Sequence, residues 1–230
     1  MMADEGGRWG TRMSRALPPP DSPASRFQVE DYDGRPALGA DGIIHSVAVR
    51  AGEPAVGYWP HMLPESTPHS ALLLGVGGAT LAHLLTRRHP GIEIVGVEKD
   101  PEVIAFAREH FDLDLPNFTL VLEDAFEYVE RCDRRYGYVA VDLFVGHVFQ
   151  RAVLRKAFLR RLGAVAAPDG EIAINMFREQ RSEQHLARIQ RILPVRRVDR
   201  LRCNIIAHCT TGEGVSGGSG RLRPRDAKQP

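Results

Sequence analysis

A glycine-rich turn is the part of the sequence whose residue types most clearly suggest ligand chemistry. An apolar run at 71–74 leads into Gly-Val-Gly-Gly-Ala at 75–79, and a helical pattern follows. Small residues let a ligand approach the backbone, and free N–H groups at a helix start attract a carboxylate or phosphate. Gly75, Gly77 and Ala79 are therefore predicted to contact a nucleotide-like cofactor. The alternative is a turn that serves only the packing of strand against helix.

The residue after this turn distinguishes between cofactors. A dinucleotide fingerprint would have a third glycine where this chain has Thr80. A Gly-x-Gly-x-Ala turn is tolerated where the ligand is an adenosyl sulfonium, because that ligand has no pyrophosphate to accommodate. The sequence therefore favours S-adenosylmethionine over a nicotinamide dinucleotide.

Two acidic residues after the next two strands could hold the adenosine. Glu98 lies 23 positions after Gly75, close to the spacing of about 20 at which an acid accepts hydrogen bonds from ribose hydroxyls. Asp124 follows the third strand, where its side chain and the backbone of Ala125 could bind adenine. The alternatives are a solvated strand-end charge for Glu98 and a helix N-cap for Asp124, which begins a capping-box pattern with Glu127.

A third acid is the candidate for catalysis. Asp142 closes the fourth predicted strand, opposite the glycine turn in a sheet of this topology, and this position predicts that it lies near the reacting sulfonium. Asp142, with His147 in the following loop, could steer or deprotonate an acceptor. A loop histidine with no identified partner is more often a bystander, and no metal is required for such a transfer.

Apolar strands that alternate with helical patterns must position these residues. The pattern predicts an α/β fold, a doubly wound, mainly parallel Rossmann-like sheet with a small N-terminal β-hairpin element. Strands are expected at 71–75, 92–98, 118–122, 137–142, 170–176, 195–199 and 203–209. Helices are expected at 79–88, from Pro101 with Asp100 as N-cap, after Asp124, at 150–162 ending at Gly163, and at 182–193.

The chain divides into four predicted segments. Residues 1–25 have the composition of a disordered leader, and 26–62 form the hairpin element, with turn signals at Asp-Gly 33–34 and 41–42. Residues 63–210 form the Rossmann-like cofactor domain. The Gly- and Ser-rich segment 211–230 is expected to be a flexible tail.

Composition excludes several classes of function. The chain has 43% hydrophobic and 26% charged residues and a net charge of +1, so no strong field favours nucleic acid or an anionic membrane. No run is long and apolar enough to span a membrane, and three cysteines without close spacing favour a reducing compartment. We therefore expect a cytoplasmic protein that acts on a small molecule, without a zinc site.

Motifs across 27–209 resemble the spermidine synthase family, more closely its spermidine-synthase-like branch on the class I S-adenosylmethionine-dependent methyltransferase fold. The resemblance rests on the glycine turn and on segments 41–46, 58–62, 97–104, 123–125, 141–142 and 174–177. It implies that Glu98 holds the ribose, that Asp124 holds the adenine and that the turn holds the methionine-like portion. It also places Tyr58 beside the acceptor, and it implies a homodimer.

The sequence departs from true aminopropyltransferases at two acids. Gly77 stands where the family has an aspartate in its turn, and Val145 stands where it has a second aspartate after the fourth strand. In the family these acids hold the amine of decarboxylated S-adenosylmethionine and deprotonate the diamine. Methyl transfer from S-adenosylmethionine is therefore favoured. The alternatives are an aminopropyltransferase with an altered acceptor site and a catalytically silent binding module.

Overall fold

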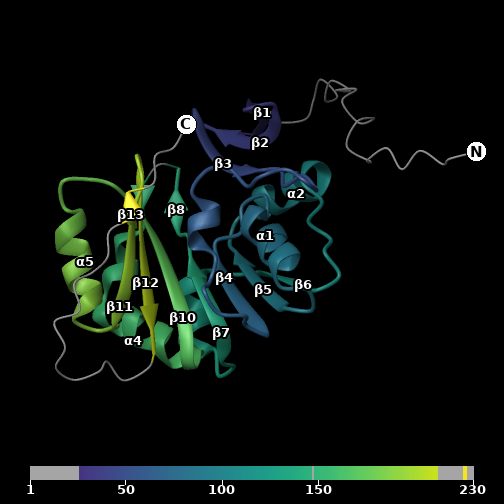
Figure 1. Ribbon diagram of the computed structural model, residues 1–230. Coiled ribbons are helices and arrows are strands. Elements are labelled where there is room, and N and C mark those ends of the chain that lie inside the picture. The colour runs from purple at the N-terminus through teal and green to yellow at the C-terminus, as the bar shows by residue number, and fades with distance from the viewer. Residues whose placement is uncertain (1–25, 147, 212–224, 227–230) are drawn as a thin grey trace, which may run out of the picture.

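The computed structural model describes residues 26–146, 148–211 and 225–226, which form an eight-stranded sheet, helices on both its faces and a smaller sheet at one end (Figure 1). The order of the large sheet is β13-β11-β12-β10-β7-β4-β5-β6. Its strands are β4 (Ser70–Leu74), β5 (Glu93–Glu98), β6 (Phe118–Leu122), β7 (Tyr136–Val141), β10 (Ala166–Phe177), β11 (Val195–Arg200), β12 (Asn204–Thr210) and β13 (Arg225–Asp226).

The connections produce a switch point in the middle of this sheet. The chain starts at β4, moves outward to β5 and β6, then returns to β7 on the other side of β4 and continues to β10, all in parallel. Only then does β12 insert antiparallel between β10 and β11. In open sheets of this kind the ligand crevice lies beyond the carboxyl ends of the strands where the order reverses, here β4 and β7.

Amphipathic helices cover both faces, as the predicted doubly wound fold requires. The helices are α1 (Thr80–Arg88), α2 (Pro101–His110), α3 (Ala125–Arg131), α4 (Lys156–Val165) and α5 (Ser182–Gln190), and the 3-10 turns are η1 (Trp59–Met62) and η2 (Arg151–Leu154). Helices α1 and α2 pack with η1 on one face of the sheet, whereas α3, α4 and α5 pack on the other. Alternate residues of each strand point to opposite faces of the sheet, so the apolar strand residues contribute to a core on each face.

The predicted helix at 150–162 is wrong in its boundaries. The chain forms η2, becomes extended at Arg155 and then forms α4, which runs through Gly163 instead of ending there. The apolar residues of α4 continue to Val165, which is 1% exposed, so burial extends the helix past the glycine. A Cβ on Gly163 would approach Leu193 to 3.3 Å, so the missing side chain serves close packing.

The N-terminal element is a three-stranded antiparallel sheet, one strand more than the predicted hairpin. Its strands β1 (Gln28–Tyr32), β2 (Arg35–Ala40) and β3 (Ile43–Val47) are joined by the two predicted Asp-Gly turns, whose residues all have positive φ. Strand β2 was missed because its sequence, Arg-Pro-Ala-Leu-Gly-Ala, is poor in strand-forming residues. Its pairing on both sides stabilises it instead.

This small sheet is fixed to the large one at the glycine turn. The Thr80 hydroxyl donates to the carbonyl oxygen of Val47 and accepts from its N–H, both at 2.9 Å. Leu38 packs with Val103 and Phe111 of the α2 region. The small sheet therefore lies over the carboxyl ends of the parallel strands.

Most of the predicted leader and tail lies outside the described residues. Of the predicted leader 1–25 and tail 211–230, residues 1–25, 212–224 and 227–230 lie outside the described residues, whereas β13 in the tail pairs with β11.

Among the described helices, none has the length and apolar character needed to cross a membrane.

Candidate functional site

A cavity of about 530 Å³ opens where β4 and β7 end, at the switch point of the sheet. Its walls come from the small sheet, the segment before η1, the glycine turn and the ends of β5, β6, β7 and β10. The predicted site residues that line it are Tyr58, Gly75, Gly77, Glu98, Asp124, Ala125 and Asp142. Acids predicted from separate strands thus share one cleft.

The glycine turn is shaped by backbone that passes very close to it. Gly75 has φ +88°, and a Cβ there would lie 2.2 Å from the carbonyl oxygen of Asp142. Gly77 has φ +54°, and its Cβ would lie 2.7 Å from Ser46 Oγ. Positive φ and close approach both require glycine. The turn is therefore pressed between the end of β7 and strand β3.

Glu98 joins the end of β5 to this turn. Its Oε2 accepts hydrogen bonds from the backbone N–H groups of Val76 at 3.1 Å and Gly77 at 3.3 Å. Its Oε1 accepts from the N–H groups of Lys99 at 2.9 Å and Asp100 at 3.2 Å. The carboxylate is therefore held in a fixed orientation at the cavity wall, which the alternative of a free solvated charge does not describe.

Asp124 combines both of its predicted positions. Its Oδ1 accepts from the N–H of Phe126 at 2.8 Å, so it is the N-cap of α3, yet it also lines the cavity with Ala125. Its Oδ2 accepts no hydrogen bond from the residues that the structure describes. One oxygen therefore serves the helix while the other is available to a ligand. The N-cap predicted at Asp100 is confirmed by its bond from Glu102 N–H at 3.0 Å.

Asp142 lies at the centre of a chain of hydrogen bonds. The Tyr58 hydroxyl donates to its Oδ2 at 2.8 Å, and Asn175 Nδ2 donates to its Oδ1 at 2.9 Å. Asn204 Nδ2 in turn donates to Asn175 Oδ1 at 3.0 Å. Both partners of the carboxylate are neutral, and within the described part of the chain no Lys, Arg or His forms an ion pair with it.

This environment changes the proton affinity of the carboxylate. Burial raises the pKa of Asp142; the hydrogen bonds from Asn175 and Tyr58 oppose that rise, and the charge of Glu98 adds to it. Burial and the neighbouring Asp142 also raise the pKa of Tyr58 well above its usual value. A partly buried carboxylate with raised pKa in a cleft has the properties of a general base.

Two residues of the predicted site are not among the described residues that line the cavity. Ala79 is 1% exposed and does not line the cavity, because it adopts a left-handed conformation at the start of α1 and packs in the core beneath it. His147 lies outside the described residues, and its predicted position beside the acceptor stays a prediction.

Sequence reasoning missed several lining residues as members of the site. They are His45, Trp59, Phe144, Gln150, Asn175, Phe177, Cys203 and Asn204. Asn175 had a usable signal, because it is a polar residue near the end of an otherwise apolar strand, Ile-Ala-Ile-Asn-Met-Phe. Trp59 and Phe144 lie within two residues of predicted site residues, whereas the fold brings His45, Gln150, Cys203 and Asn204 to the cavity from separate segments.

Comparisons with known proteins agree with this geometry, although no family model matches the chain. It is 34% identical over 122 residues to N-terminal histidine N-methyltransferase of Emericella nidulans, which covers 50% of this chain and 21% of that protein. It is 25% identical over 136 residues to polyamine aminopropyltransferase of Neisseria meningitidis, which covers 58% and 51%. The chain thus spans about half or less of the length of these relatives.

Solved structures share the fold at low identity. A probable spermidine synthase from Corynebacterium glutamicum has a TM-score of 0.68 at 18% identity, covering 84% of this chain and 80% of that one. Human methyltransferase-like protein 13, in complex with SAH, has a TM-score of 0.57 at 20% identity, covering 62% and 71%. The chain therefore has the predicted class I S-adenosylmethionine-dependent methyltransferase fold. Its homologues include methyltransferases and polyamine aminopropyltransferases.

Proposed function

We propose that this protein is an S-adenosylmethionine-dependent transferase that moves a methyl group to a small acceptor. The observation that carries the proposal is the division of one cavity into two ends. Glu98 and Asp124 line one end, and Asp142 with its neutral partners lines the other. The glycine turn lies between them.

The residues of the first end fit an adenosyl cofactor. Glu98 is fixed by four backbone N–H groups and faces the cavity, where it can accept from ribose hydroxyls. Asp124 has an oxygen available for the adenine amino group. Bare backbone at Gly75 and Gly77 leaves room for the methionine portion.

The surroundings of Gly77 support S-adenosylmethionine over its decarboxylated form. A Cβ at this position would meet Ser46 Oγ at 2.7 Å and the carbonyl oxygen of His45 at 3.1 Å. An acidic side chain there would need β3 to move away. Without that acid, one like charge fewer faces the cofactor carboxylate, and the amine of the decarboxylated form lacks the anionic partner that an acid at position 77 would supply.

Asp142 supplies the proton acceptor at the second end. When bound, S-adenosylmethionine supplies an electrophilic methyl carbon, to which the acceptor lone pair bonds as the carbon–sulfur bond breaks and sulfur keeps the electron pair. Asp142 accepts the proton that the acceptor loses, and its raised pKa suits that step. Tyr58 and Asn175 hold the carboxylate in place.

Aminopropyl transfer is the second candidate, supported by the likeness to polyamine aminopropyltransferases in sequence and to a probable spermidine synthase in fold. Calorimetry with S-adenosylmethionine, its decarboxylated form and methylthioadenosine separates the candidates. We expect S-adenosylmethionine to bind more tightly than the decarboxylated form, and Glu98→Gln to weaken both. Glu102→Gln, an exposed acid on the adjacent helix, is the matched control.

Each other outcome of this experiment has a distinct meaning. Tighter binding of the decarboxylated form would replace methyl transfer with aminopropyl transfer. Absence of binding by all three ligands would leave a silent module. Equal binding to the wild type and Glu98→Gln would remove the assigned role of Glu98.

A further inference from the structure

The second end of the cavity is lined mainly by rings. Tyr58 and Trp59 stack with centroids 4.3 Å apart and planes at 28°, and Phe144 meets Phe177 edge to face at 5.0 Å and 78°. Tyr58 touches Asp142 directly, Phe144 lies two residues beyond Asp142, and Phe177 lies two residues beyond Asn175. Both ring pairs therefore adjoin the carboxylate.

The same end offers little charge. This end is formed by the lining residues of the segment before η1, of 142–150 and of the ends of β10 and β12. Among these described residues Asp142 is the one with a charged side chain, and the remaining polar groups are Tyr58, Cys203 and three amides, Gln150, Asn175 and Asn204. A diamine with two positive charges would need a second anionic partner far from the first. Val145, which is 50% exposed on the short strand β8 (Phe144–Val145), cannot provide one.

The cavity also limits the size of the acceptor. Its volume of about 530 Å³ is within the range of a single ligand pocket, and the cofactor must share it. Aromatic side chains form part of the wall, and an aromatic ring of the acceptor can pack against them with favourable contacts. A nucleophilic group on that ring would then lie next to Asp142.

Given the proposed function, on which this step rests, we infer that the acceptor is a small planar aromatic molecule with a single nucleophilic N–H or O–H group. The ring lies against the two aromatic pairs, and the N–H or O–H group donates to Asp142. The transfer itself follows the bond changes given above, with the acceptor proton passing to Asp142. A linear aliphatic diamine finds no second anionic partner at this end of the cavity, and it has no ring to pack against the aromatic side chains.

Binding measurements test this inference without depending on catalysis. The probes are 2-phenylethylamine, its saturated analogue 2-cyclohexylethylamine, 1,4-diaminobutane and the tripeptide Phe-Gly-Gly, each titrated by calorimetry with and without S-adenosylhomocysteine. The saturated analogue matches the aromatic probe in charge and length but has no aromatic ring. We expect the aromatic amine to bind about tenfold more tightly than the saturated amine and the diamine.

Substitutions locate the preference within the molecule. Phe144→Leu combined with Phe177→Leu should reduce the aromatic preference to about twofold or less while S-adenosylhomocysteine still binds. Phe106→Leu is the control, because Phe106 packs against Phe27, Phe111 and His110 and does not itself line the cavity.

The contrary outcomes are separable from failure of the proposed function. Equal or tighter binding of the saturated amine or the diamine, or no binding of any probe at millimolar concentration, overturns the inference even when the cofactor binds. Tighter binding of the tripeptide overturns its restriction to small molecules. Loss of cofactor binding overturns the proposed function, whereas the titrations without cofactor still test the acceptor class.

Discussion

Two carboxylates of the large-sheet region, Asp142 and Asp199, differ in the charge of the groups that surround them. Asp199 on β11 is 5% exposed and lies 3.2 Å from Arg197 Nε, 3.4 Å from His208 Nε2 and 3.7 Å from His61 Nδ1. Asp142 has only the neutral Tyr58 and Asn175. One carboxylate is compensated by basic groups, whereas the other is not.

Their proton affinities differ accordingly. Burial alone would raise the pKa of Asp199, but His208, His61 and Arg197 together hold it well below its usual value. Burial raises the pKa of Asp142 because no cation opposes it. Charge burial without a counter-charge costs stability and is retained mainly where function uses it. The difference therefore supports the proposed role of Asp142 in transfer and is consistent with a structural role of Asp199.

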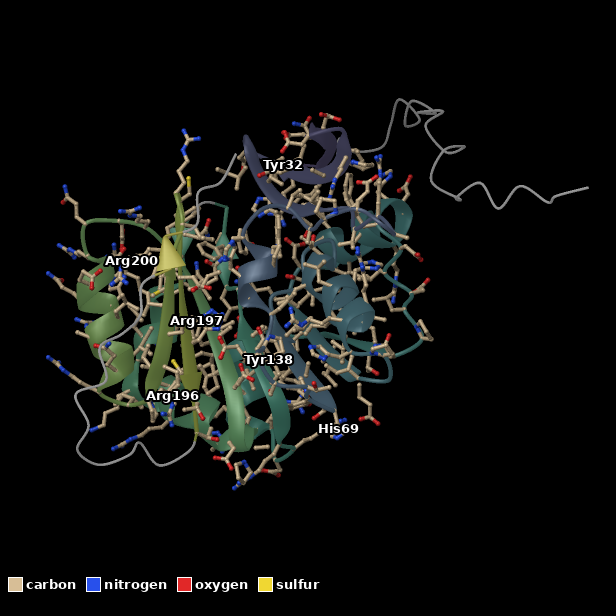
Figure 2. All side chains as sticks on the ribbon, in the orientation of Figure 1. Tyr32, His69, Tyr138, Arg196, Arg197 and Arg200 are labelled. Carbon is tan, nitrogen blue, oxygen red and sulfur yellow. The ribbon has the colours of Figure 1, made fainter. Side chains whose placement is uncertain are left out.

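The residues around Asp199 connect the large sheet to the segment around η1 through ion pairs and hydrogen bonds. Figure 2 shows Arg197 and Tyr138, which lie on the face of the sheet that α1 and α2 also occupy. Arg197 pairs with Glu65, and the Tyr138 hydroxyl donates to the carbonyl oxygen of Met62. Glu171 accepts from the N–H groups of Glu65 and Ser66 at 2.9 and 2.7 Å. These contacts fix the segment that begins with Tyr58.

The sharpest way to break the comparison is Asp142→Asn. We expect the rate of transfer to fall about 100- to 10,000-fold, because a positioned base is lost. The free energy of unfolding should rise by about 1 kcal/mol, or roughly 2–4 °C in Tm, because a partly buried charge without a counter-charge is removed. Enzyme assay and thermal melting measure both. Exposed Asp133→Asn is the control, and a variant that lost stability along with activity would contradict a functional Asp142.

The corresponding change at Asp199 should do the opposite. Asp199→Asn leaves Arg197 without its buried partner, and we expect a loss of about 2 kcal/mol, or roughly 4–8 °C in Tm. Cofactor binding by the folded protein should remain within about twofold of wild type, because Asp199 does not line the cavity. An unchanged Tm in the melting curve would show that the cluster contributes nothing.

Tyr58→Phe sharpens the comparison at the site itself. Removal of the hydroxyl takes away a hydrogen bond to ionised Asp142, so the pKa of the carboxyl should rise further and the acid limb of the pH–rate profile should move upward. The rate near neutral pH should fall about tenfold. Tyr128→Phe, which loses only its bond to Tyr136, is the matched control. A profile that does not move would remove Tyr58 from the network.

The pH dependence of stability gives the smallest effect and the clearest sign. The pKa of Asp199 is lower in the folded state, so its contribution is present above the unfolded value of about 3.9 and is lost as the pH falls below it. The pKa of Asp142 is higher in the folded state, so its cost is present at neutral pH and is relieved as the pH falls. Urea unfolding of wild type and both Asn variants from pH 7 to pH 3 should therefore show differences of opposite sign, both shrinking toward low pH. Parallel curves would contradict both assignments.

Local signals in the sequence predicted the parts of the fold that local physics controls. The glycine turn and the N-caps at Asp100 and Asp124 depend on residues within a few positions, and all three have the expected structure. Strand β2 was missed because its pairing with the neighbouring strands β1 and β3 outweighs a weak strand preference. The end of α4 was missed because packing against a distant residue, Leu193, continues the helix past Gly163.

The candidate site divides in the same way. Its three acids lie at or just after the carboxyl ends of strands. Because such ends meet at one edge of a parallel sheet, the sequence predicted that the acids share one site. The hydrogen bonds of Asp142 with its two partners were not predicted, because Tyr58 is 84 residues and Asn175 is 33 residues away in sequence. The Asp199 cluster was missed for the same reason, since His61 and His208 come from separate elements.

The double hydrogen bond of Thr80 with Val47 has a consequence for motion. The Thr80 hydroxyl donates to and accepts from the backbone of a single residue, Val47 of β3, and Thr80 is the first residue of α1. The N–H of Gly78 also donates to Ser46 Oγ at 2.6 Å. We therefore expect the turn and β3 to open as one unit in hydrogen exchange, so that a ligand that protects the turn also protects a strand more than 30 residues earlier in the chain.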